Sequence, residues 1–96
     1  MGERRAIVEA RREEIRALVR RHHGRSAALF GSVARGEDTA TSDVDFLVDF
    51  EAGSSLFDLL HLQDELAELL GCAVDVISVG GLKPRDEHIR SEALPL

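Results

Sequence analysis

Residues 44–50 alternate between the two faces of an extended chain, and this pattern constrains the fold more than any other segment. Its apolar side chains share one face: Val44, Phe46, Val48 and Phe50. The opposite face carries Asp45, Leu47 and Asp49, in line with Asp43 just ahead. Successive side chains of a strand point to opposite sides. The run therefore predicts a strand that packs on one face and carries acids on the other.

Three carboxylates are candidates for one site. Asp43 and Asp45 point the same way, about 7 Å apart along an extended chain, and Asp75 lies in a second apolar run, 73–77. Close carboxylates repel each other by about 4 kcal/mol per pair at an effective dielectric near 20. Mg²⁺ would relieve that repulsion, because it prefers hard oxygen ligands. The alternative is a set of surface aspartates that bind no metal.

The first third of the chain predicts a helix, a strand and a turn. Residues 3–22 carry apolar side chains at helical spacing and predict one amphipathic helix that Gly24 ends. The short apolar run 26–30 predicts a buried strand. Residues 31–36 predict a sharp turn into a short helix that begins under Ser32, followed by a polar loop.

The second half predicts another helix and another strand. Ser55 and Asp58 resemble a capping box, with Asp in place of Glu or Gln, for an apolar-periodic helix over 56–70 that Gly71 closes. Its inward side consists of leucines: Leu59, Leu62, Leu66, Leu69 and Leu70. The remaining elements follow in order: a strand over 72–79, a turn at 80–81 and a helix from Pro84 to about Ala93.

Strands separated by helices predict an α/β (α+β) fold, a small mixed sheet of three to four strands flanked by helices. The helix over 56–70 is long enough for a parallel crossover between the strands on either side of it, which would bring Asp75 beside Asp43 and Asp45. With 96 residues, the chain is expected to form a single domain over 1–96. The apolar segment 92–96 either docks onto a partner or completes the core.

Composition excludes several classes of protein. Apolar residues make up 44% and charged residues 31% of the chain, and no apolar run approaches the roughly 20 residues of a membrane span. Nothing resembles a signal peptide. The lone Cys72 excludes an internal disulfide and a cysteine-based zinc site, which is typical of a cytoplasmic protein. We therefore expect a cytoplasmic protein without membrane contacts.

The net charge of −6 is unevenly distributed. Residues 1–36 hold nine arginines against four glutamates, whereas residues 37–96 hold three basic and fourteen acidic residues. The basic part could steer an anionic ligand or an acidic partner, or it could be the solvated face of a helix. The acidic remainder argues against broad, direct binding to nucleic acid.

The motifs resemble one family when they are taken together. The pattern runs Gly31-Ser32-x-x-Arg35-Gly36, then Ser42-Asp43-x-Asp45, with Asp75 as the third acid. It resembles the minimal nucleotidyltransferase subfamily of the DNA polymerase beta-like nucleotidyltransferases, over nearly the whole chain. The combined pattern is specific, whereas any single piece of it would be weak.

The resemblance implies a fold and a set of roles for these residues. It implies the nucleotidyltransferase fold, with Gly31 and Ser32 holding the triphosphate of ATP. It also implies two Mg²⁺ ions held by three acids, which double as the catalytic residues: Asp43, Asp45 and Asp75. The third of these acids would act as general base or as a metal ligand for the nucleophile.

Arg35 and the scattered histidines carry weaker indications. The resemblance implies that Arg35 contacts phosphate or braces the loop, and the alternative is a surface ion pair with Glu37 or Asp38. The four histidines have no metal-ligand spacing and are expected to be structural or exposed.

The resemblance also implies a partner. Larger members of the superfamily add a helical domain, for which this sequence has no room, so the acceptor would come from elsewhere. In minimal members, the enzyme moves AMP from ATP to a tyrosine of a HEPN-family ribonuclease toxin, acting as an antitoxin in a hetero-oligomer. Two alternatives stay open: an antitoxin that only covers its toxin, and nucleotide transfer to a small molecule such as an aminoglycoside.

Overall fold

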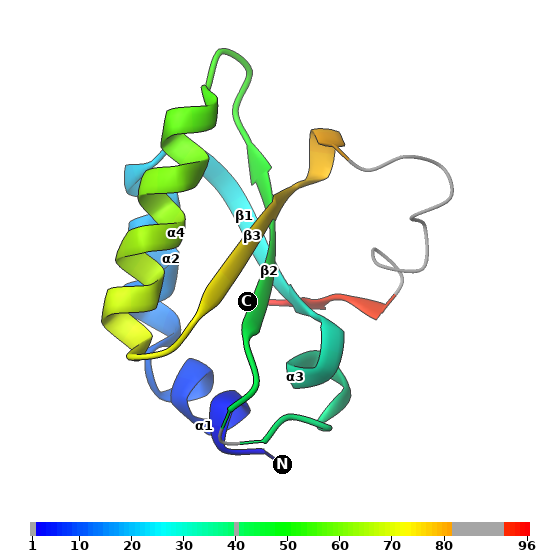
Figure 1. The fold of residues 1–96 in the computed structure, drawn as a ribbon. Coiled ribbons are helices and arrows are strands. Elements are labelled where there is room, and N and C mark those ends of the chain that lie inside the picture. Colours follow the sequence, from blue (N-terminus) through cyan, green and yellow to red (C-terminus); the bar gives the residue numbers. More distant parts are fainter. Residues whose placement is uncertain (1, 40, 82–91) are drawn as a thin grey trace.

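The computed structural model describes residues 2–39, 41–81 and 92–96. The elements run in the order α1 (Glu3–Ala10), α2 (Arg12–Arg21), β1 (Gly24–Phe30), α3 (Gly31–Arg35), β2 (Val44–Phe50), α4 (Leu56–Leu70), β3 (Val74–Ser78), the 3₁₀ turn η1 (Val79–Gly81) and β4 (Leu94–Pro95). Figure 1 shows α2 and α4 side by side against the sheet, with α1 and α3 at the lower end of the molecule.

The four strands form one mixed sheet in the order β3-β2-β1-β4. β2 pairs with β3 in parallel, whereas β1 is antiparallel to both β2 and β4. The long helix α4 connects the two parallel strands, as the length of the apolar-periodic segment predicted. The expected mixed sheet of three to four strands is confirmed, with four strands in the described part of the chain.

The core lies between the sheet and the helices α2 and α4. β2 supplies Val44, Phe46 and Val48, each at most 1% exposed, from the face that the alternating pattern predicted to be apolar. The helices contribute aliphatic side chains to the same cluster: Ile15 and Val19 from α2, and Leu62, Leu66 and Leu70 from α4. The other face of β2, which carries the acids, is therefore turned away from these helices.

The single helix predicted over 3–22 is wrong, because two helices meet at Arg11. Its φ of −110° and ψ of 16° interrupt the helical geometry, and the chain changes direction there. The break places Val8 of α1 and Ile15 of α2 in the same core cluster. Hydrophobic spacing did not reveal the break, since both segments keep helical periodicity.

Gly24 does not end the second helix, contrary to the prediction. α2 ends at Arg21, and His23 takes the left-handed conformation, with φ of 67°. Gly24 is the first residue of β1, and a Cβ there would lie 2.5 Å from Cγ1 of Val19. The glycine is needed for close approach of α2 to the strand rather than for a positive φ.

Most other boundaries agree with the prediction. β2 and α4 have the predicted bounds, and the Ser55 N–H donates to Oδ2 of Asp58 at 2.9 Å, as expected in a capping box. The first strand begins two residues earlier than predicted, the third is shorter than 72–79, and the short helix begins at Gly31 rather than Ser32. The helix predicted from Pro84 lies outside the described residues.

The apolar segment 92–96 completes the core, one of its two predicted roles. Leu94 and Pro95 form β4 beside Leu29 and Ala28 of β1. Leu94 and Leu96 also pack against the core cluster. In the part of the chain that the structure describes, no helix is long and apolar enough to cross a membrane.

Candidate functional site

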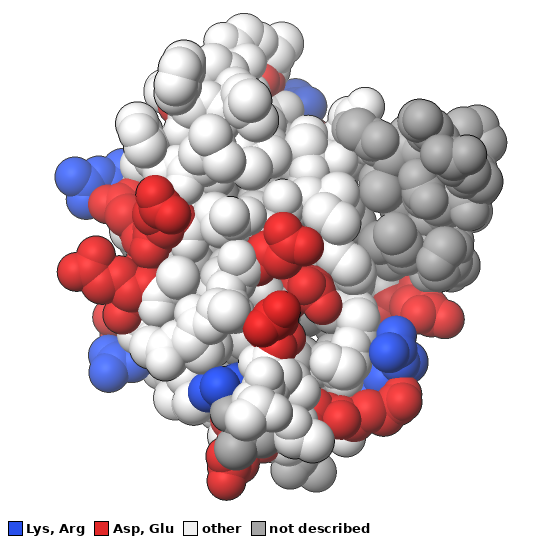
Figure 2. Space-filling model, viewed as in Figure 1, with Lys and Arg blue, Asp and Glu red and all other residues white. Residues whose placement is uncertain are grey.

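Asp45 and Asp75 lie directly opposite each other on neighbouring parallel strands, β2 and β3. Asp43 is an exposed residue one position ahead of β2. Figure 2 shows a compact group of acidic side chains in the middle of this face, where β2 and β3 run in Figure 1. The prediction that Asp75 lies beside Asp45 is therefore confirmed by the strand register.

The charges of Asp43 and Asp75 act on Asp45. The pKa of Asp45 is raised, first by partial burial and then by the negative charges of Asp75 and Asp43, while Arg35 acts in the opposite direction. Charge on Asp45 is therefore unfavourable in the protein as it stands. A cation among the three side chains would reverse that penalty.

The donor chemistry fits a hard divalent cation. The candidate ligands are carboxylate oxygens, which Mg²⁺ prefers, and they are held by two adjacent strands and the loop that leads into one of them. Among the described residues, no three His, Cys, Asp or Glu side chains already stand in the arrangement of a metal-ligand group. A metal would therefore have to draw these carboxylates together.

Gly31 forms the wall of the site next to Asp45. β1 ends at Phe30, which pairs with Asp45, and α3 begins at the next residue. Gly31 has a φ of 73°, a conformation that other residues avoid, and a Cβ there would lie 2.5 Å from Oδ2 of Asp45. Ser32 follows in the first turn of α3 and is partly buried. The predicted turn thus meets the predicted acids.

A buried carboxylate that the sequence did not reveal holds the loop before Asp43. Asp38 is 9% exposed, and its Oδ2 accepts the backbone N–H groups of Arg4 at 2.8 Å and Arg5 at 3.4 Å, so it caps α1. The guanidinium Nε of Arg4 in turn donates to the carbonyl oxygen of Ser42 at 3.0 Å. α1 is thereby tied to the residue directly before Asp43.

No local spacing could have identified this contact, because Asp38 and Arg4 are 34 residues apart. The sequence indicated Asp38 only as an alternative ion partner for Arg35. Its second oxygen, Oδ1, is buried and accepts no hydrogen bond from the described residues.

Arg35 pairs with Glu37, one of the two partners in the alternative interpretation, and also with Glu92, which the sequence did not indicate. Its Nε lies 2.7 Å from Oε1 of Glu37, and its Nη1 lies 3.8 Å from Oε2 of Glu92. The hydrogen bond and charge of Glu37 raise the pKa of Arg35, with smaller contributions from Glu92 and Asp45. Arg35 therefore lies within electrostatic reach of the acids while it pairs with Glu37.

The basic first third of the chain is largely a solvated helix surface. Arginine–glutamate pairs at helical spacing join Arg5 to Glu9, Arg11 to Glu14 and Arg12 to Glu9. Exposed pairs of this kind contribute little stability. This favours the simpler of the two interpretations of the arginine run.

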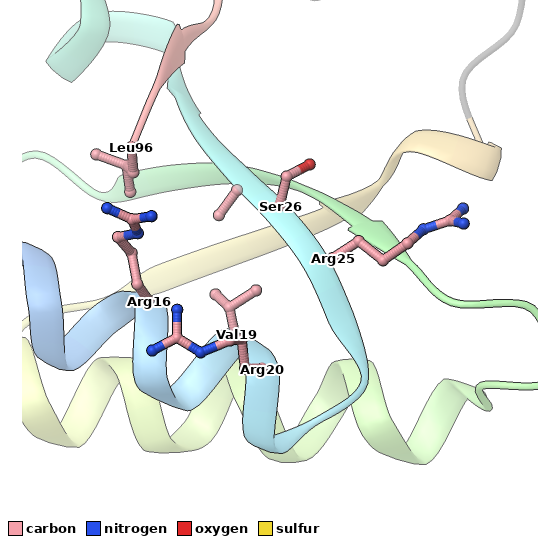
Figure 3. A pocket seen from close by; sticks show the side chains of 7 residues that line it. Arg16, Val19, Arg20, Arg25, Ser26 and Leu96 are labelled. Atoms are coloured by element: carbon pink, nitrogen blue, oxygen red, sulfur yellow. The ribbon is translucent and has the colours of Figure 1, made fainter.

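A hollow of about 120 Å³ lies between α2 and β1, and arginines line it together with Val19, Ser26, Ala27 and Leu96. Arg16 and Arg20 extend side by side from α2, whereas Arg25 points away from them (Figure 3). Arg16 pairs with Glu13 at 3.7 Å and Arg25 with Asp49 at 3.5 Å. The hollow includes none of the predicted site residues.

A second cleft, of about 290 Å³, lies on the face of the sheet that carries the acids. It is lined by residues of β1, β2, η1 and the last segment: Ser26, Ala27, Ala28, Leu47, Asp49, Val79, Ala93, Pro95 and Leu96. Leu47 and Asp49 follow Asp45 on the same face of β2. The cleft therefore continues from the candidate site along the strand.

The sequence matches a known protein family, because the family model of the nucleotidyltransferase domain covers residues 11–95. The chain belongs to this family. A protein of Methanocaldococcus jannaschii named "putative protein adenylyltransferase" is 45% identical over 92% of this chain and 95% of its own length. The protein adenylyltransferase MntA of Thermococcus cleftensis is 41% identical over 81% of this chain and 76% of its own length.

Solved structures agree with this assignment. A structure described as a "putative minimal nucleotidyltransferase" superposes with a TM-score of 0.87 at 44% identity, covering all of this chain and 97% of the other. A toxin-antitoxin crystal structure with AMP-PNP superposes with a TM-score of 0.75 at 21% identity, covering 86% of this chain and 69% of the other, and shows the same fold. This nucleotidyltransferase is an enzyme with the minimal form of the fold, as the resemblance implied.

Proposed function

We propose that this nucleotidyltransferase transfers AMP from ATP, with Mg²⁺, to a tyrosine of a HEPN-family ribonuclease toxin and so acts as its antitoxin. The observation that carries the proposal is the pairing of Asp45 with Asp75 beside Gly31. This arrangement combines a cation site with a turn through which phosphate can approach the backbone. The names of the relatives, protein adenylyltransferases, support the same reaction.

The nucleotide would lie across the face of the sheet that carries the acids. Gly31 leaves room for the triphosphate, and the Ser32 hydroxyl would donate a hydrogen bond to it. The cleft beside Leu47 offers apolar walls for the nucleoside. The toxin-antitoxin structure that contains AMP-PNP supports nucleotide binding by this fold.

The carboxylates would hold the metal and accept a proton. Asp43 and Asp45 are the proposed ligands, and Asp75 is the proposed ligand or base at the acceptor. When bound, Mg²⁺ would neutralise the triphosphate and make the acceptor hydroxyl more acidic. The acceptor oxygen forms a bond to the α-phosphorus, the bond from that phosphorus to pyrophosphate breaks, and the hydroxyl proton passes to Asp75.

A protein acceptor agrees with the composition of the chain. The chain contains no tyrosine, so a tyrosine acceptor would belong to another protein. AMP on a tyrosine in the RNA-binding site of a ribonuclease would add negative charge and bulk where RNA phosphate must bind. The reaction would therefore silence the toxin directly, and we place it in the cytoplasm.

A mass measurement tests the proposal. The protein is mixed with a HEPN-family toxin from the same genome, ATP and Mg²⁺, and we expect the toxin to gain the mass of one or more AMP units. Asp45→Asn should abolish the gain, whereas Glu51→Gln, at an exposed acid one position beyond the end of β2 and outside the cleft beside Leu47, should retain it. A toxin that forms a tight complex without gaining mass would contradict the proposal.

That last outcome is the signature of the second candidate, an antitoxin that neutralises by binding alone. The ordered placement of Gly31 against Asp45 favours catalysis, because a protein that only covers its toxin does not need it. Nucleotide transfer to an aminoglycoside is a weaker candidate, and an assay with kanamycin and ATP in place of the toxin would detect it.

A further inference from the structure

The solvent-facing side of α4 changes character along its length. Leu56, Phe57 and Leu60 are 68%, 70% and 41% exposed in its first turns, and Asp64 and Glu68 are exposed further along. From Phe57 onward these residues recur at helical spacing, so they form one surface, here called the α4 stripe. Figure 2 shows the uncharged part above and acidic side chains along the left side, where the later turns of α4 lie in Figure 1.

Neither half of the α4 stripe stabilises the protein by itself. Leu56 and Phe57 lie mostly in water and gain little from burial. Asp64 and Glu68 are like charges four residues apart, towards the end of the helix where its dipole disfavours negative charge. The last turn contains no basic residue, and none of the ion pairs between described residues involves Asp64 or Glu68.

We propose that the α4 stripe docks a helix of the acceptor protein. The helix would place apolar side chains against Phe57 and Leu60, and Lys or Arg side chains against Asp64 and Glu68. Charge complementarity selects this occupant, because a basic segment relieves both the repulsion between the acids and their unfavourable position on α4. The inference rests on the proposed function in one respect, namely that the acceptor is a protein.

A second copy of this chain fits the α4 stripe poorly. A two-fold interface pairs the same surface with itself. If the two helices ran parallel, Asp64 and Glu68 would face the same acids of the other copy, and these like charges would repel. The other arrangement is antiparallel. The acidic half of one stripe would then cover the apolar half of the other, so Asp64 and Glu68 would be buried against Leu56 and Phe57. Burial of carboxylates against apolar groups is costly.

Docking on the α4 stripe would leave the nucleotide site accessible. α4 packs on the core through Leu62, Leu66 and Leu70, on the opposite side of the helix from the stripe. Asp45 lies on the face of β2 that is turned away from that core. Substitutions in the stripe should therefore weaken protein binding without disturbing the acids.

A peptide assay tests the docking surface without the natural acceptor. The probe is a synthetic amphipathic helix with leucines at one end and an arginine pair at i and i+4 at the other, and fluorescence anisotropy measures its affinity. We expect Phe57→Ser/Leu60→Ser and Asp64→Lys/Glu68→Lys each to weaken binding about tenfold or more. A probe with glutamates in place of the arginines should not bind.

The matched control carries the same change of charge on another helix. Glu13→Lys/Glu14→Lys on α2 adds as much positive charge as Asp64→Lys/Glu68→Lys but lies outside the α4 stripe. It should change affinity for the basic probe by less than about threefold through long-range electrostatics. Equal losses in both double variants would overturn the proposal, because they would show that the probe responds only to net charge.

An assay with the toxin separates this inference from the proposed function. In the α4 stripe variants we expect the KM for the toxin to rise while kcat is retained, whereas Asp45→Asn should lose transfer and bind the probe normally. Transfer by stripe variants with an unchanged KM would overturn the docking surface alone. Loss of probe binding in these variants, without AMP transfer by any form, would support the surface and contradict the proposed reaction. A dimer that Phe57→Ser/Leu60→Ser dissociates would overturn the proposed occupant.

Discussion

Gly31 lies so close to Asp45 that a Cβ at position 31 would stand 2.5 Å from the Oδ2 atom of the acid. The end of β1 and the start of β2 are thereby brought together where phosphate and metal would meet. Because Gly31 also has a φ of 73°, two independent reasons require glycine at this position.

Substitution of this glycine should damage the site more than the fold. Gly31→Ala is expected to cost about 1–2 kcal/mol of stability from its positive φ, and to displace the Asp45 carboxylate. We therefore expect AMP transfer to fall at least about tenfold, measured with protein that melts as a single transition.

The chain offers a matched control at Gly36. It has a φ of 74°, but a Cβ there would meet nothing within 4 Å. Gly36→Ala should lose a similar amount of stability and keep most of its activity. Similar activity losses in both variants would show that backbone strain, not contact with Asp45, accounts for the effect of Gly31→Ala.

Neutralisation of Asp45 should stabilise the protein while it removes activity. The pKa of Asp45 is raised in the folded state, so its charged form is disfavoured there relative to the unfolded chain. The Asp45 carboxyl makes its full contribution to stability while it is protonated, below its unfolded pKa near 3.8. That contribution is lost as the pH rises through the raised pKa of the folded state. Asp45→Asn should therefore melt above the wild type at neutral pH without Mg²⁺.

The pH profile of that difference distinguishes the charge from a packing effect. The gain in Tm should disappear below about pH 4, where the wild-type carboxyl is protonated in both states. Thermal melts from pH 3 to 8 would measure it, with Asp49→Asn as the control on the same strand. A difference that stays constant over this range would contradict the electrostatic interpretation.

The contact between Arg4 and Ser42 should position Asp43. Arg4→Ala removes the donor to the Ser42 carbonyl, and we expect kcat to fall several-fold and the Mg²⁺ requirement to rise. Arg4→Lys should recover part of the loss, because Lys can still donate to the carbonyl. Arg11→Ala, which removes only an exposed pair with Glu14, should leave both parameters unchanged.

Asp38 should stabilise the protein where the start of α1 meets the loop before Asp43. Asp38→Ala leaves the first N–H groups of α1 without their buried acceptor, and such a loss of a helix cap costs about 1–2 kcal/mol. Urea unfolding would measure the change. A cost below about 0.5 kcal/mol would indicate that water replaces the carboxylate without difficulty.

Truncation of two leucines of α4 should destabilise the protein to different extents. Leu66 is fully buried, so Leu66→Ala is expected to cost about 2–5 kcal/mol. Leu60 is 41% exposed and faces away from the core, so Leu60→Ala should cost less than about 1 kcal/mol and mainly weaken protein binding. Urea unfolding of both variants would test the assignment of the two sides of the helix, and equal costs would contradict it.

The sequence predicted the acids of the site more completely than the surrounding contacts that hold them in place. The alternation over 44–50 indicated which face of β2 carries the acids, and the strand register then confirmed Asp75 as the neighbour of Asp45. The break at Arg11 was not predictable because both flanking segments keep helical periodicity, and the cap at Asp38 was not predictable because it joins segments far apart in the chain. The roles of the acids remain predictions.

The sequence by itself determined most of the local elements, the parallel connection through α4 and the family. These follow from periodicity, capping residues and motif spacing, which are all encoded over short distances along the chain. Only the tertiary structure decided that Gly31 must approach Asp45, that α1 braces the loop before Asp43, and that part of α4 stays uncovered. Each of these depends on which side chains meet across the fold, and the free energy of such contacts is set by packing and burial rather than by neighbours in sequence.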